Sequence, residues 1–118
     1  MDQVTVEAER AAYVQKLDRA PRRIVELLAQ LDGVERVSLF GSYAQGRRDL
    51  FTDLDVLVVW KTDRALLERL RSLYSLLDVA VDMDVICYTP AEFEEMRDRP
   101  FLRQVLREEV LLFEKKPS

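Results

Sequence analysis

The sequence predicts an α/β or α+β fold in which helices pack on a small mixed β-sheet. Three short apolar segments, at residues 34–40, 53–60 and 79–88, have the length of buried strands. Segments with leucines at helical spacing lie between and around them. Glycine, proline and a capping motif mark the boundaries. This alternation is typical of a sheet covered by helices.

The N-terminal segment, residues 6–31, is predicted to be helical. A first helix covers Val6 to Asp18, and Pro21 should interrupt it or begin a second helix, because proline suits a first turn and not a helix interior. The second helix carries apolar residues at helical spacing: Ile24, Leu27, Leu28 and Leu31. Gly33 is the expected C-terminal stop.

The next segments form the centre of the predicted sheet. Residues 34–40 read as a strand that Gly41 and Ser42 end, and a short helix over 43–47 follows. Residues 48–52 are a polar loop before the second strand, 53–60. A helix capped by Thr62 or Asp63 comes next. Its inward side is expected to hold the leucines at 66, 67, 70, 73, 76 and 77.

The C-terminal part completes the predicted fold. The third strand, 79–88, leads into the capping box Thr89-Pro90-Ala91-Glu92, which starts a helix with Phe93 and Met96 inward. Pro100 begins a last helix, and residues 110–113 are expected to add an edge strand. We expect one domain over residues 1–118, with its core at 33–113.

The composition excludes several classes of protein. The net charge is −4, from 18 basic and 22 acidic residues, which disfavours bulk nucleic-acid binding. Histidine is absent, so any metal must be held by oxygen ligands that suit Mg²⁺ or Mn²⁺. The one cysteine, Cys87, lies in an apolar strand and reads as a core residue. Residues 1–10 do not resemble a signal peptide, and the apolar run 56–60 is too short to span a membrane, so a cytoplasmic protein is expected.

Paired aspartates stand in two of the predicted strands. Asp53 and Asp55 share one strand face, at a Cα separation of roughly 7 Å, and Asp82 and Asp84 repeat the pattern on the third strand. Buried carboxylate pairs are costly without a cation, which favours a divalent metal site between adjacent strands. The alternative is that these aspartates flank the strands at a solvent-exposed edge.

Gly41 and Ser42 add a feature suited to phosphate. Glycine lets a phosphate approach the backbone closely, the following amides favour an anion, and the Ser42 hydroxyl can donate a hydrogen bond. A phosphate cradle beside a metal site is the combination that phosphoryl or nucleotidyl transfer requires.

The spacing of Gly41-Ser42, ten residues, and Asp53-Leu54-Asp55 resembles the signature of the DNA polymerase β-like nucleotidyltransferase superfamily. The resemblance extends over about residues 33–113. It implies that Gly41 and Ser42 bind the triphosphate of ATP or another nucleoside triphosphate, and that Asp53 and Asp55 bind Mg²⁺, with two ions expected. A third aspartate would complete the metal site and help to activate the acceptor hydroxyl; Asp84 is our choice, and Asp82 could substitute.

The chain departs from the family pattern at two positions. Thr52 stands where many members have serine, and Gln45 stands where many have arginine. This leaves Arg47 or Arg48 as a phosphate contact, unless both lie in a solvated loop.

The resemblance also implies a partner. Minimal members of the superfamily are often paired with a helical HEPN-type toxin, and the transferase places AMP on a hydroxyl of that toxin as its antitoxin. Because 118 residues leave no room for a separate acceptor domain, the acceptor should bind across an interface. The alternatives are a non-catalytic module that neutralises its partner by contact, and an adenylyltransferase acting on a small molecule such as an antibiotic.

Overall fold

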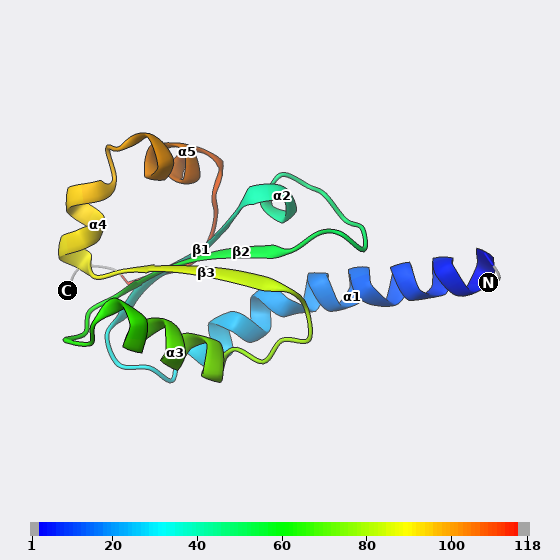
Figure 1. The fold of residues 1–118 in the computed structure, drawn as a ribbon, viewed down its shortest axis with the longest axis horizontal. Coiled ribbons are helices and arrows are strands. Elements are labelled where there is room, and N and C mark those ends of the chain that lie inside the picture. The colour runs from blue at the N-terminus through cyan, green and yellow to red at the C-terminus, as the bar shows by residue number, and fades with distance from the viewer. Residues whose placement is uncertain (1–2, 116–118) are drawn as a thin grey trace.

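The structure is a computed structural model that describes residues 3–115, and it contains five helices and four strands within that range (Figure 1). In chain order the elements are α1 (Gln3–Leu28), β1 (Val34–Phe40), α2 (Gly41–Ala44), β2 (Leu54–Trp60), α3 (Leu66–Leu76), β3 (Met83–Tyr88), α4 (Pro90–Met96), α5 (Pro100–Glu108) and β4 (Val110–Glu114).

The four strands form one mixed sheet in the order β3-β2-β1-β4. β2 pairs with β3 in parallel, and β1 pairs antiparallel with both β2 and β4. Helices α1 and α3 cover one face of this sheet, and α4 and α5 cover the other (Figure 1). The predicted fold class, a small mixed sheet with helices packed on it, is confirmed.

The central strand β2 sends alternate side chains into two cores. Val56 and Val58 are fully buried in the core beneath α1 and α3, whereas Leu57 packs in the smaller core beneath α4 and α5. Because side chains two positions apart share a strand face, Asp55 points to the same side as Leu57. The face that carries Asp55 is therefore the one that α4 and α5 only partly cover.

Helix α1 continues through Pro21, so the predicted interruption is wrong. Proline in a helix interior costs roughly 3 kcal/mol. Leu17, Ala20 and Ile24 flank Pro21 on the sheet side and are almost completely buried. Burying a leucine or isoleucine contributes about 1.5–3 kcal/mol each, which offsets the cost of the proline.

Two other boundaries differ from the prediction. The α2 helix begins at Gly41 and ends at Ala44, instead of covering 43–47. Strand β3 begins at Met83 and not at residue 79, because Ala80 has a φ of +60°, a turn conformation that a strand cannot contain. Asp82 therefore lies just outside the strand.

The start of α3 also corrects the prediction. Its N-cap is Ala65, and the Thr62 hydroxyl instead accepts a hydrogen bond from the Arg64 amide at 3.3 Å, closing a turn ahead of the helix. Leu66 and Leu67 are exposed, whereas Leu73 and Leu77 are buried. The prediction that all six leucines of this segment face inward is therefore correct only for its later turns.

The C-terminal elements agree with the sequence. Thr89 and Glu92 form the predicted capping box at the start of α4, and α5 begins at Pro100. Cys87 is buried in the larger core, as expected for a structural cysteine. Within residues 3–115, no helix has the length and apolar character needed to cross a membrane.

Candidate active site

Two of the predicted site carboxylates lie side by side on parallel strands. Asp55 on β2 is the register partner of Asp84 on β3, so their Cα atoms are about 4.8 Å apart. Asp53 precedes β2 by one position and is partly exposed. Asp84 is exposed near the start of an edge strand, where a second reactant could reach it.

The electrostatics of Asp55 show uncompensated negative charge. Burial raises the pKa of the Asp55 carboxyl, and the negative charges of Asp84 and Asp53 raise that pKa further. No positive side chain contributes to the shift. A carboxylate in this setting is stabilised when a cation binds beside it.

The same carboxylates fit a magnesium ion in chemistry and number. Within residues 3–115, no three acidic, histidine or cysteine side chains already enclose a metal position. Mg²⁺ in phosphate-transferring enzymes usually takes one or two carboxylates from the protein and its other ligands from water and substrate phosphates. An adjacent pair such as Asp55 and Asp84, with Asp53 near, is the donor set that this mode of binding uses.

The turn after β1 brings the backbone against the acidic pair. Gly41 has a φ of +74°, and a Cβ added there would lie 2.1 Å from the Asp55 Oδ2 atom. Only glycine fits this position without displacing the carboxylate. The backbone amides that follow Gly41, and the half-buried Ser42, therefore stand next to the candidate metal ligands.

The two arginines of the following loop have different surroundings. Arg48 stacks over the Tyr43 ring, with its Cζ atom 3.5 Å from the ring centroid, and its Nε donates to Asp18 of α1 at 3.1 Å. These contacts hold the Arg48 side chain, and with it the loop, against α1. Arg47 is exposed and its Nε donates to the neighbouring Asp49 at 2.8 Å, an ion pair that solvent weakens. Arg47 is the arginine that can turn toward a phosphate at low cost.

The loop before β2 is fixed by hydrogen bonds that place Asp53. Thr52 is fully buried, its hydroxyl donates to Asp49 at 3.0 Å, and its carbonyl accepts a hydrogen bond from Tyr13 of α1 at 2.9 Å. Burial raises the pKa of the Tyr13 hydroxyl, a hydrogen bond with the Asp82 backbone lowers it, and the charges of Asp82 and Asp53 raise it.

Sequence reasoning missed one contact at this site, between α2 and α5. The Gln45 side chain donates to Glu108 at 2.7 Å, and Glu108 also accepts from Gln104. Gln45 caps the C-terminal end of α2, the helix that begins at Gly41, so this contact ties α2 to α5. The signal available in the sequence was the glutamine at a position where arginine is common, but its partner lies 63 residues away.

A glycine turn, a serine and adjacent acidic strands on an incompletely covered sheet face are the features expected of a site that transfers a phosphorus-containing group. Together with the mixed sheet, this arrangement is that of a nucleotidyltransferase. The family described as polymerase beta, nucleotidyltransferase matches residues 22–118. The chain therefore belongs to the polymerase β nucleotidyltransferase family and is an enzyme of that class, which confirms the resemblance identified in the sequence.

Individual relatives agree with this assignment. The chain is 34% identical over 73 residues to a Methanocaldococcus jannaschii protein named as a candidate protein adenylyltransferase, covering 61% of this chain and 77% of the relative. It is 30% identical to a candidate minimal nucleotidyltransferase of known structure, with a TM-score of 0.56, covering 82% and 93% of the two chains. It is 25% identical to a chain in the crystal structure of a toxin–antitoxin with AMP-PNP, with a TM-score of 0.51, covering 81% and 74%.

Proposed function

We propose that this enzyme transfers AMP from ATP to a hydroxyl group of a partner protein, with Mg²⁺ as cofactor, and that it acts as the antitoxin of a toxin–antitoxin pair. The observation that carries the proposal is the contact between the Gly41 turn and Asp55, whose register partner is Asp84. This contact supports the proposal because the backbone after Gly41, which would bind the phosphates, lies beside carboxylates that would hold the metal. The relatives that resemble the chain include a protein adenylyltransferase and a toxin–antitoxin complex with AMP-PNP.

In the proposed reaction, the acceptor oxygen forms a bond to the α-phosphorus of ATP. The bond from that phosphorus to the oxygen bridging to the β-phosphate breaks, and pyrophosphate leaves. Asp84 accepts the proton of the attacking hydroxyl, because it is the most exposed of the three carboxylates. The backbone after Gly41, the Ser42 hydroxyl and Arg47 hold the triphosphate.

Asp53, Asp55 and Asp84 would hold the Mg²⁺ ions. Bound there, Mg²⁺ would neutralise charge on the phosphates and on the leaving pyrophosphate. The uncompensated charge at Asp55 supports this role, because the pKa of Asp55 is raised by burial and by its two acidic neighbours.

The acceptor is proposed to be a HEPN-type helical partner. The family resemblance suggests this partner, and the match to a toxin–antitoxin complex supports it. Asp84 and the face beside α5 are accessible from outside, so a protein hydroxyl can reach the site without a second domain in this chain. A partner held only by contact would need none of these carboxylates.

The test is to co-express the chain with its HEPN-type partner and to measure AMP on the partner by mass spectrometry. Asp84→Asn should lower the modified fraction by about 100-fold or more, because it removes a metal ligand and the proton acceptor with little change in shape. Asp82→Asn is the matched control, since Asp82 is a nearby exposed carboxylate outside β3. It should leave modification nearly unchanged.

Three results would reject parts of the proposal. An unmodified partner that is nevertheless silenced would make the chain a contact inhibitor. Equal losses in Asp82→Asn and Asp84→Asn would reject Asp84 as the third carboxylate. Transfer of AMP to a small molecule, with no modified protein, would replace the protein acceptor.

A further inference from the structure

The acidic pair stands in a row of three side chains that crosses the sheet. Phe40, the last residue of β1, is the register partner of Asp55, and Asp55 is the register partner of Asp84. Phe40 packs against the core beneath α4 and α5, so the row lies on the sheet face that these helices cover only in part. An aromatic ring therefore flanks the candidate metal ligands, one residue before the turn at Gly41.

A second aromatic ring, from α5, extends this apolar surface toward solvent. Phe101 is the second residue of α5, and its ring packs on the Phe40 ring at a centroid separation of 6.2 Å and an interplanar angle of 88°. Phe101 is nevertheless 55% exposed. An edge-to-face pair uses at most one face of either ring, so Phe40 leaves at least one face of the Phe101 ring free.

Other aromatic rings of the molecule are covered by cations. Arginine side chains lie over the rings of Tyr43, Trp60 and Phe93. Among residues 3–115, none lies over Phe101 in this way. An open aromatic face beside the turn at Gly41 is a platform on which a planar ligand can stack.

The side of α5 that carries Phe101 faces α2. Residues three or four apart on a helix share one side, so Phe101, Gln104 and Glu108 form a stripe along α5. Glu108 accepts a hydrogen bond at 2.7 Å from Gln45, at the end of α2, which holds this stripe beside α2. The charge of Glu108 disfavours phosphate at its end of the stripe, whereas the Phe101 end suits an uncharged ring.

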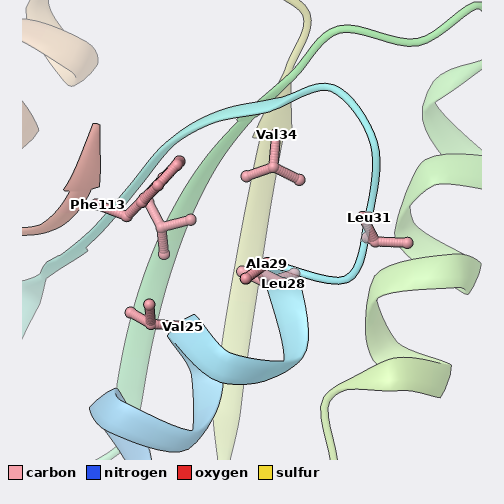
Figure 2. Close-up of a pocket in the computed structure, with 7 residues that line it drawn as sticks. Val25, Leu28, Ala29, Leu31, Val34 and Phe113 are labelled. Carbon is pink, nitrogen blue, oxygen red and sulfur yellow. The ribbon is translucent and has the colours of Figure 1, made fainter. Parts of the chain in front are cut away.

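The apolar pocket on the other face of the sheet is unsuited to the same ligand. It has a volume of about 190 Å³ and lies between the C-terminal end of α1 and the sheet, with Phe113 of β4 in its lining (Figure 2). Val34 and Val37 line it and belong to the core beneath α1 and α3. Asp55 points to the opposite face, so the sheet separates this pocket from the acidic pair. A nucleotide bound at that pair has Phe101 on its own side of the sheet.

We propose that Phe101 is the platform on which the base of the nucleoside triphosphate stacks, an inference that rests on the proposed nucleotidyl transfer. The backbone after Gly41 and the Ser42 hydroxyl hold the phosphates, and the Phe101 ring holds the base. Phe40 supports the Phe101 ring by its edge-to-face contact. Every base offers a flat face, so stacking on Phe101 should add affinity without selecting strongly among bases.

Calorimetric titration of the whole chain with two magnesium complexes tests this role. One probe is MgATP, and the other is magnesium tripolyphosphate, which carries three phosphates but no base. Phe101→Ala should weaken MgATP binding by about tenfold, because it removes the stacking contact. It should leave tripolyphosphate binding unchanged, which would also show that the variant keeps its fold and its phosphate site.

Two variants serve as controls for Phe101→Ala. Phe101→Tyr keeps an aromatic ring and should bind MgATP as the parent does. Phe51→Ala removes a ring that is 81% exposed on the loop before β2, and it should also bind MgATP as the parent does. Equal weakening in Phe51→Ala and Phe101→Ala would contradict a specific role for Phe101.

Three further results would overturn the inference. Equal weakening of MgATP and tripolyphosphate in Phe101→Ala would mean that Phe101 supports the phosphate site and does not contact the base. Unchanged MgATP binding with weaker binding of the acceptor protein would assign the Phe101 ring to that partner, and nucleotidyl transfer would still stand. A parent chain that binds neither complex would reject the proposed function as well.

Discussion

Glycine is required at position 41 for two reasons. Its φ is +74°, and a Cβ at this position would overlap the carboxylate of Asp55. Gly41→Ala should lower the free energy of unfolding by about 1–3 kcal/mol and lower the rate of nucleotidyl transfer by about 100-fold, because it strains the turn and displaces Asp55. Thermal denaturation and a transfer assay measure the two effects.

Gly46→Ala is the control for Gly41→Ala. Gly46 also has a positive φ, +104°, but a Cβ there meets no atom within 4 Å. It should cost about 1 kcal/mol of stability through the backbone alone and leave most of the activity. Equal losses of activity in both variants would mean that the contact with Asp55 does not matter.

The Asp55 carboxylate should be needed for transfer but should lower the stability of the metal-free fold. Without metal, its charge is partly buried and is repelled by Asp84 and Asp53. Asp55→Asn should therefore raise the stability of the metal-free protein at neutral pH by a small amount, because solvent screens a partly exposed carboxylate, while abolishing transfer. Thermal denaturation in a chelator checks the first effect, and a lower melting temperature for the variant would contradict it.

At the scale of elements, one ion pair links α3 to α4. The Arg69 guanidinium is buried, and its two terminal nitrogens donate to the two carboxylate oxygens of Glu92 at 2.8 and 3.1 Å. Arg69 also donates to the Arg64 carbonyl, at 3.0 Å. The hydrogen bonds from Arg69 lower the pKa of Glu92, and a hydrogen bond from the Thr89 backbone lowers it further.

The lowered pKa of Glu92 gives a pH dependence of defined sign. Stability from this pair is fully present above the unfolded-state pKa, about 4.3, and is lost as pH falls through the lower folded-state pKa. Glu92→Gln should remove about 1–3 kcal/mol at pH 7 and flatten the stability profile below about pH 4.5, while glutamine still allows a capping box. Denaturant titrations at several pH values measure both effects.

Glu94→Gln provides the comparison on the same helix. Glu94 pairs with Arg97 at 3.4 Å, but its side chain is 73% exposed. Exposed pairs contribute little, so the stability and its pH profile should hardly change. If Glu92→Gln and Glu94→Gln lowered the free energy of unfolding equally, burial of the Arg69–Glu92 pair would not be the reason for its contribution to stability.

At the scale of the whole molecule, the proposed site joins β1, β2 and β3, so a ligand bound there should stabilise the entire sheet. Mg²⁺ and ATP together should raise the melting temperature more than either alone. At a hundredfold excess over Kd, a bound ligand adds about 2.7 kcal/mol to the free energy of unfolding. Asp53→Asn combined with Asp55→Asn should remove the Mg²⁺-dependent part. Asp63→Asn, at an exposed loop position, should respond as the parent does.

Much of this architecture could be predicted from the sequence because its causes are local. The strand at 34–40, the capping box at Thr89 and the Gly41-Ser42 break each depend on neighbouring residues only. The continuous apolar run of β2 likewise predicts a strand that is buried on both faces. The spacing from Gly41 to Asp55 was enough to indicate the family, which the match to residues 22–118 confirms.

Contacts between distant segments decided the rest. Pro21 stays within α1 because the sheet buries the residues around it, and the pairing of β2 with β3 puts Asp84 and not Asp82 in register with Asp55. Gln45 contacts Glu108 of α5, and the Tyr74 hydroxyl of α3 accepts a hydrogen bond from the Val85 amide of β3. Local propensities of about 1 kcal/mol or less per residue define the segments, whereas burial and pairing between segments contribute more and decide how they meet.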